Sequence, residues 1–157
     1  EYFDTKEEII ACAVVYRMQW TFEHIGSILM EKNSFQEQIE LLLNETEEQG
    51  KRKFCFWRLV HMLTDNSDFS QLVRQRMASE PFAEYLPVKV FGRVLQRGVE
   101  RGELRKDLPL EYMVYSVLSR LLSYLMAITT KDCFHVDAAA LRPLVYQGIM
   151  DELLQVR

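Results

Sequence analysis

Residues 5–31, TKEEIIACAVVYRMQWTFEHIGSILME, decide the fold class of this chain. Apolar side chains recur there at steps of three and four residues, at Ile10, Val14, Met18, Phe22, Ile25 and Leu29. This period is typical of one face of an α-helix. Thr5 and Glu8 have the spacing of a capping box, and the acidic residues lie where the positive end of the helix dipole favours them. The stretch predicts a long helix that runs to about Glu31.

The helical period continues along the chain, and no segment keeps the alternation of a β-strand for long. Ser34 and Glu37 form a second capping box, and we expect Gly50 with the basic residues 51–53 to end that helix as a glycine stop. The segment 54–64 is apolar almost all round, which predicts a helix in the middle of the domain. The fold class is therefore all-α.

Prolines divide the second half of the chain. Pro81 and Pro87 cannot both lie inside one regular helix, because each lacks an amide donor and crowds the preceding turn. We expect a kink or restart near Ser79. Pro109 suits the first turn of a new helix over residues 110–129.

Three further positions mark helix boundaries. If Pro143 lies in the first turn of the last helix, that helix begins no earlier than about Ala139. Gly98 and Gly102 indicate a fraying helix end. We expect about six helices in one domain.

Composition and charge exclude several classes of protein. The chain has 157 residues, of which 48% are apolar and 27% charged, so it is neither disordered nor collagenous. Residues 1–50 carry eleven acidic against three basic side chains, and the remainder carries sixteen basic against twelve acidic. Neither part has the strongly basic surface that nucleic-acid binding requires. Taken alone, the chain is expected to bind DNA poorly.

The spacing of the cysteines and the length of the apolar runs indicate where in the cell the chain is expected. The chain has three cysteines with no C-x-x-C spacing, Cys12, Cys55 and Cys133. Their number and spacing argue against a disulfide framework and a zinc knuckle, which favours a cytoplasmic location. Residues 112–128 come nearest to a membrane span, but Arg120 and three serines favour a buried helix instead. No membrane partner is expected.

Motifs of catalysis are absent from the sequence. The histidines His24, His61 and His135 lie far apart, and there is no H-E-x-x-H, G-x-S-x-G, P-loop or G-x-G-x-x-G. Asp132 and His135 form the one carboxylate-x-x-histidine pair, in a predicted loop. We therefore expect no enzyme, no metal site and no cofactor.

Two segments carry a resemblance to a known family. Residues 2–10, YFDTKEEII, combine an aromatic pair, two linker residues, Lys-Glu-Glu and two aliphatic residues, and residues 97–109 read RGVERGELRKDLP. In this order and separation they resemble the TetR family of bacterial transcriptional regulators. There the first pattern joins the DNA-binding headpiece to the first regulatory helix, and the second lies between the seventh and eighth helices.

The resemblance implies a regulatory domain whose helix-turn-helix headpiece would precede it. Residues 1–4 would be a remnant of that headpiece, and residues 5–157 the ligand-binding and dimerisation domain. Two residues match the DNA-contacting set: Tyr2 the aromatic that ends the recognition helix, and Lys6 the lysine that contacts a phosphate. In this chain alone Lys6 is expected to be a solvated first-turn lysine.

The resemblance also implies an apolar cavity for a small apolar or amphipathic ligand. The residues expected on the helices around it are Trp20, Phe22, Phe54, Trp57, His61, Met62, Phe91 and Tyr115. For any single aromatic residue, packing in the core is the competing interpretation. His61 either orients a ligand or bonds a backbone carbonyl.

In the family, the last two helices pair with their symmetry copies into a four-helix bundle. The resemblance therefore predicts a homodimer with an interface along these helices, at Ser116, Ser119, Ser123, Ala127, Leu141, Val145, Gly148 and Ile149. The small residues would let the backbones approach closely. The competing interpretation is packing within one subunit.

Four arginines repeat every four residues, at Arg93, Arg97, Arg101 and Arg105, which predicts a basic stripe along one helix. We expect a solvated face paired with Glu100 and Glu103 rather than a site for an acidic partner.

Together these patterns predict the effector-binding and dimerisation domain of a TetR-type repressor that a ligand releases from its operator DNA. The alternative is a free-standing helical small-molecule carrier or protein-interaction domain.

Overall fold

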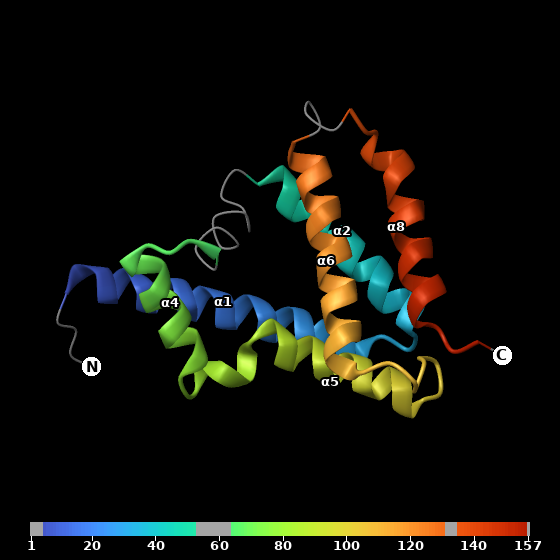
Figure 1. Cartoon of the computed structure of the whole chain (residues 1–157), viewed down its shortest axis with the longest axis horizontal. Coiled ribbons are helices and arrows are strands. Elements are labelled where there is room, and N and C mark those ends of the chain that lie inside the picture. Colours follow the sequence, from blue (N-terminus) through green and yellow to red (C-terminus); the bar gives the residue numbers. More distant parts are fainter. Residues whose placement is uncertain (1–4, 53–63, 131–134, 157) are drawn as a thin grey trace.

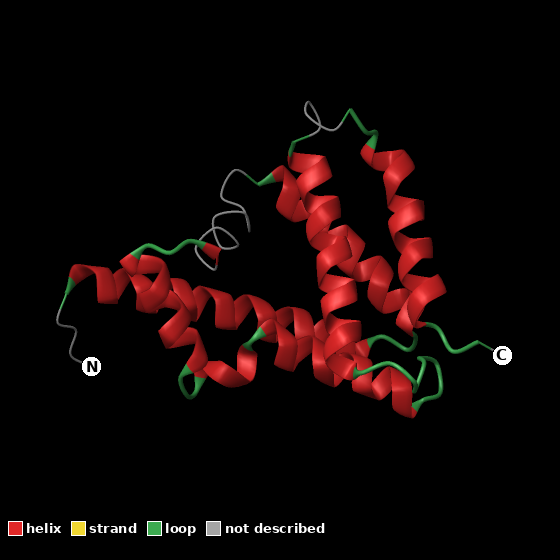
Figure 2. Cartoon of the chain, viewed as in Figure 1, coloured by secondary structure: helices red, strands yellow, loops and turns green. Residues whose placement is uncertain are grey.

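The computed structural model describes residues 5–52, 64–130 and 135–156, and all regular structure in these ranges is helical (Figure 2). The all-α prediction with about six helices is confirmed. The elements are α1 (Lys6–Glu31), α2 (Phe35–Lys51), α4 (Asp68–Ala78), the 3₁₀ helix η1 (Phe82–Tyr85), α5 (Pro87–Glu100), α6 (Leu110–Thr129) and α8 (Ala138–Leu153).

The helices form two groups that meet at α5 and α6 (Figure 1). One group contains α1 with α4, η1 and α5, and the other contains α2 with α6 and α8. Helices α6 and α8 run antiparallel beside each other, and the amino-terminal end of α1 extends away from them (Figure 1). The interface of α5 with α6 therefore joins the long first helix to the bundle.

Helix α1 has the predicted boundaries. The Thr5 side chain accepts a hydrogen bond from the backbone N–H of Glu8 at 3.2 Å, and the helix ends at Glu31. The predicted apolar face is only partly right, because Ile10 is 44% exposed. The buried face instead comprises Ala11, Cys12, Val15, Met18, Phe22, Gly26 and Leu29.

The amino terminus of α2 is capped from two parts of the chain. The Ser34 hydroxyl accepts from the Glu37 N–H at 3.2 Å, as the capping box predicts. The Glu103 carboxylate, which follows α5, accepts from the Phe35 N–H at 2.8 Å. A carboxylate at a helix amino terminus also interacts favourably with the helix dipole. This contact links the start of α2 to the connection between α5 and α6.

The prediction that Gly50 stops α2 is wrong. The helix continues through Gly50 to Lys51, with Arg52 as the C-cap. A Cβ atom at Gly50 would lie 2.8 Å from Cγ2 of Ile128 on α6. Gly50 therefore allows α2 and α6 to pack closely, which is a different use of glycine from ending a helix.

The restart predicted near Ser79 is confirmed. Helix α4 ends at Ala78 with Ser79 as its C-cap, and α5 begins with Pro87 in the first turn, where the missing amide donor is harmless. The short η1 bridges the two helices.

The Gly98–Gly102 segment is tightly closed, so the predicted fraying is wrong. Gly102 has φ of 77° and its N–H donates to the Val99 carbonyl, while the Glu103 N–H donates to the Gly98 carbonyl. These two bonds form a Schellman motif, in which a glycine takes the left-handed conformation. Leu104 then packs on Gly98 and forms an isolated antiparallel bridge with Leu154.

The last helix begins one residue before the predicted Ala139, and Pro143 does not lie in its first turn. Helix α8 begins at Ala138, with Asp137 as N-cap, so Pro143 lies in its second turn rather than its first. Pro143 is exposed and leaves the Ala139 carbonyl without its helical donor. Solvent on this side of α8 makes the loss tolerable.

The two glycines inside α5 provide a matched stability test. A Cβ at Gly98 would lie 2.7 Å from Cδ1 of Leu104, whereas a Cβ at Gly92 would meet nothing closer than 3.9 Å. We expect Gly98→Ala to lower the free energy of unfolding by about 1–3 kcal/mol through overpacking. Gly92→Ala should raise it by up to about 1 kcal/mol through helix propensity. Urea unfolding at 25 °C measures both, and equal effects would contradict the packing at Gly98.

Candidate functional site

The structure separates the residues predicted to line a ligand cavity. Phe22 on α1 and Phe91 on α5 are buried in the core. Trp20 and Tyr115 lie on the surface, 56% and 67% exposed, so they do not line an interior cavity with the other two. The remaining four, Phe54, Trp57, His61 and Met62, lie outside the described residues. The cavity that would unite the set stays a prediction.

A small apolar crevice lies between α1, α4 and η1. Its volume is about 10 Å³, which is room for about one water molecule. Oε1 of Gln19 is buried, and no donor of the described residues forms a hydrogen bond with it. The lining residues are Val15, Met18, Gln19, Phe22, Met77, Phe82, Tyr85 and Leu86. This crevice is too small for the apolar ligand that the sequence predicts.

A larger hollow of about 330 Å³ lies on the surface of α2. Five of its six lining residues have polar side chains, but these line it mostly with their apolar atoms; the six are Lys32, Gln36, Glu37, Glu40, Leu41 and Asn44. Two of its carboxylates already have partners, because Glu37 accepts from the Asn33 N–H and Glu40 from Arg142. The hollow therefore offers little unsatisfied polarity to a ligand.

Several of the predicted interface residues on α6 and α8 are used within one chain. Ser116, Ala127 and Ile149 are buried in the structure. The Ser116 hydroxyl donates to the carboxylate of Glu152 on α8. Ser116 therefore contributes to the contact of α6 with α8, and the burial of Ala127 and Ile149 favours the packing interpretation for these two residues.

Gly148 also serves the packing of α8 on α6. A Cβ at this position would lie 2.6 Å from NH1 of Arg120, whose guanidinium passes over the glycine to pair with Glu152 at 3.2 Å. The hydrogen bond from Ser116 and the pairing with Arg120 hold the pKa of Glu152 below its ordinary value.

The other predicted interface residues are accessible to different degrees. Ser123 is exposed, whereas Ser119, Leu141 and Val145 are half-buried. The sequence interpretation missed three large side chains on the same two helices that are more exposed, Tyr112, Tyr115 and Leu144. Tyr115 had been assigned to the ligand cavity. An exposed apolar residue in an apolar helix has no distinct sequence signal, since the helical period also fits core packing.

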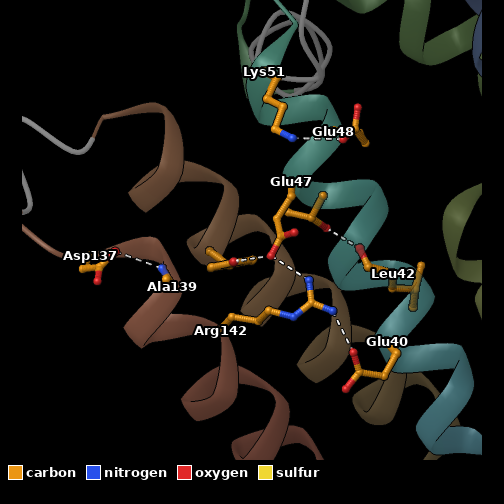
Figure 3. Close-up of polar contacts among 10 residues, drawn as sticks. Glu40, Leu42, Glu47, Glu48, Lys51, Asp137, Ala139 and Arg142 are labelled. Atoms are coloured by element: carbon orange, nitrogen blue, oxygen red, sulfur yellow. Dashed lines mark hydrogen bonds and ion pairs between the residues drawn. The ribbon is translucent and has the colours of Figure 1, made fainter.

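A polar cluster joins α2, α6 and α8 (Figure 3). Arg142 of α8 donates to Glu47 and to Glu40 of α2, at 2.7 Å in each case. The buried Tyr124 of α6 donates its hydroxyl to Glu47 at 2.8 Å. Glu47 therefore accepts charge-assisted hydrogen bonds from two different helices, which fixes α8 against α2.

The electrostatics of this cluster follow from those contacts. Partial burial alone would raise the pKa of Glu47, but the hydrogen bonds from Arg142 and Tyr124 outweigh burial and lower the pKa below its ordinary value of 4.5. Burial and the hydrogen bond to Glu47 raise the pKa of Tyr124. Glu47 is therefore ionised and Tyr124 protonated at neutral pH, an arrangement suited to holding helices together.

The arginine row is shorter than predicted. Helix α5 ends at Glu100, so Arg101 is its C-cap and Arg105 lies beyond it. Arg101 pairs with Glu103 as expected, and Arg105 pairs with Asp107 at 2.6 Å. Glu100 accepts from Gln96 instead of from an arginine. The prediction of a continuous basic stripe along one helix is therefore wrong.

The residues matched to DNA contact are placed only in part. Tyr2 lies outside the described residues, and Lys6 is the exposed first residue of α1. Among the described residues, His, Cys, Asp and Glu form no group of three or more that could hold a metal ion.

Helix α6 alone among the described helices is long and apolar enough to cross a membrane by length and composition. It packs against α2, α5 and α8, and its buried residues include Met113, Val117 and Leu121. These contacts support the interpretation of α6 as a core helix.

Comparison with known proteins returns no family model, no curated protein and no solved structure that matches this chain. The relation to TetR regulators stays a prediction from the two sequence segments.

Arg142 provides a test of the polar cluster. Replacing it by Met leaves Glu40 and Glu47 without their cation, and we expect the free energy of unfolding at pH 7 to fall by about 1–2 kcal/mol. Arg93→Met is the control, because the pair of Arg93 with Glu84 is exposed and its atoms lie 3.7 Å apart. That change should cost at most about 0.5 kcal/mol. Indistinguishable urea midpoints for the two variants would refute a stabilising role for the cluster.

The pKa of Glu47 predicts a specific acid response. A carboxyl group whose pKa is lower in the folded state stabilises the fold above its unfolded pKa, and this stability is lost as the pH falls through the folded value. We expect the stability of the wild type to fall more steeply below pH 4.5 than that of Glu47→Gln. Glu48→Gln, which removes an exposed carboxylate that pairs with the exposed Lys51, should keep the wild-type slope. Chemical unfolding between pH 3 and 7 gives the slopes.

Proposed function

We propose that this chain is the effector-binding and dimerisation domain of a TetR-type transcriptional regulator, which a small, largely apolar ligand releases from its operator. The sequence segments 2–10 and 97–109 support the family. The structural observation that carries the proposal is the outward surface of the antiparallel pair α6 and α8.

Large apolar side chains face solvent on this pair. Leu144 of α8 is 69% exposed, and Tyr112 and Tyr115 of α6 are exposed with ring centroids 6.3 Å apart. The half-buried Leu122 and Met126 continue the same side of α6 at helical spacing. An apolar surface of this kind favours contact with another protein surface. Two antiparallel helices from each of two copies would complete a four-helix bundle.

The proposed interface differs from the one that sequence alone suggests. Ser116, Ala127 and Ile149 contribute to packing within the chain, so the contact between copies would rest on Tyr112, Tyr115 and Leu144. Ser119 and Ser123 lie on the same side of α6 and would allow close approach. In such a dimer, α6 and α8 of the second copy would cover Tyr112 and Tyr115.

The regulator proposal extends to ligand and DNA. The effector would bind beside α1, and Phe22 and Phe91 are the two predicted lining residues that the structure places in the core. Operator DNA would be bound by a headpiece that precedes Tyr2.

The second candidate is a free-standing carrier or interaction domain, for which the exposed face of α6 and α8 would serve a different partner. The genomic codons upstream of Glu1 separate the two, since an in-frame helix-turn-helix favours the regulator.

Charged substitutions on the outward face test the proposed dimer. We expect the wild-type chain to sediment as a dimer and the double variant Tyr115→Glu, Leu144→Glu to sediment as a monomer, because a buried unpaired carboxylate in the interface is costly. Val88→Glu, at an exposed apolar position on α5, is the control and should leave the dimer intact. Circular dichroism verifies folding. A wild type that is monomeric at 100 μM would refute this interface.

A further inference from the structure

Helix α1 carries a stripe of exposed residues on the side away from its buried face, and Tyr16 of this stripe also touches Phe82 of η1. Six exposed residues follow one another at alternating steps of three and four residues, Lys6, Ile9, Ala13, Tyr16, Trp20 and Glu23. We call these six residues the α1 seam. This spacing is that of the contact positions of a coiled coil. The apolar centre of the seam is flanked by one cation and one anion, so the two ends carry opposite charge.

The two aromatic side chains of the α1 seam are held in position by neighbours. The Trp20 ring stacks on His24, with centroids 5.4 Å apart and planes 8° apart, and the Arg17 guanidinium lies 5.0 Å from the ring centroid. The Tyr16 ring meets Phe82 edge to face at 5.2 Å. Aromatic groups that are already ordered lose little conformational entropy on binding, and tryptophan is a frequent anchor of interfaces.

The order of residues in the α1 seam is complementary to itself in one direction. If a second copy runs antiparallel, Ala13 lies opposite Tyr16 of that copy, and Ile9 lies opposite its Trp20. Each large side chain then meets a smaller one. At the ends, Lys6 lies opposite Glu23 of the second copy, and each contact occurs twice by symmetry. A parallel pair would instead place Lys6 against Lys6 and Glu23 against Glu23.

From this complementarity we propose that the α1 seam is a second homotypic contact, in which α1 helices of two copies pair antiparallel. The contact goes beyond the proposed function, because it uses neither α6 nor α8. The seam spans about five helical turns, roughly 27 Å. A contact of one helix with one helix through six residues a side is smaller than the roughly 20–30 residues a side of a typical stable interface, so the association is weak and concentration-dependent. With both contacts formed, two dimers would join into a higher assembly.

Charge reversal at the ends of the α1 seam tests the pairing and its direction. Sedimentation equilibrium is measured on the Tyr115→Glu, Leu144→Glu protein, in which the α6 and α8 contact is removed. We expect Lys6→Glu or Glu23→Lys alone to weaken self-association about tenfold, and the two together to restore it. Glu31→Lys, an exposed change on α1 outside the seam, is the control and should have little effect. Trp20→Glu should abolish the association.

A photo-crosslinker gives the register independently. With benzoylphenylalanine in place of Trp20 in the wild-type chain, the expected product joins two copies between position 20 and the region of Ile9. Three results would overturn the proposal. These are an absence of self-association in the Tyr115→Glu, Leu144→Glu protein, a failure of Lys6→Glu combined with Glu23→Lys to restore it, and a crosslink that joins position 20 to position 20 of the other copy. A crosslink to a different protein in cells would also overturn it. Failure of the α6 and α8 dimer leaves these outcomes unchanged, so the two proposals fail separately.

Discussion

The burial of α6 is the constraint on which the rest of the structure depends. This helix contacts α2, α5 and α8, so the two groups of helices are held together through it. Two of these neighbours, α2 and α8, carry a glycine where they approach α6. Gly50 allows α2 to approach Ile128, and Gly148 makes room for the Arg120 side chain. Because close packing leaves little tolerance for extra volume, these glycines are as important as the apolar residues.

Polar contacts then select one arrangement of the bundle. Hydrogen-bonded charges add to the packing because they have to meet their partners at fixed positions. Glu47 with Arg142 fixes the amino-terminal part of α8, and Glu152 with Arg120 fixes its carboxy-terminal part. The two pairs lie at opposite ends of α8 and together determine its register.

Signals that are local in the sequence predicted the structure well. The N-cap hydrogen bonds of Thr5 and Ser34 and the proline at the start of α5 depend on neighbours within four residues, and all three are confirmed. The errors concern residues whose role is decided elsewhere in the chain. The local pattern predicts that α2 stops at Gly50, because the contact of Gly50 with Ile128 leaves no trace in that pattern. Glu47 and Arg142, 95 residues apart, give no periodic signal at all. For the candidate site, helical period could not distinguish buried Phe22 from exposed Trp20, because both lie on an apolar stretch of α1.

The Glu103 carboxylate at the start of α2 has a mechanical consequence. It ties the turn after α1 to the connection that follows α5, so the carboxy-terminal end of α1 is anchored where two loops meet. The other end of α1 lies at the periphery of the molecule (Figure 1). Helix α4 packs on α1, so the two helices move together. A helix of 26 residues is about 39 Å long, so a tilt of about 10° at the anchored end displaces the amino-terminal end by roughly 7 Å. The long helix is thus a lever arm that amplifies small changes of angle in the core into motions of a whole side-chain length at its tip.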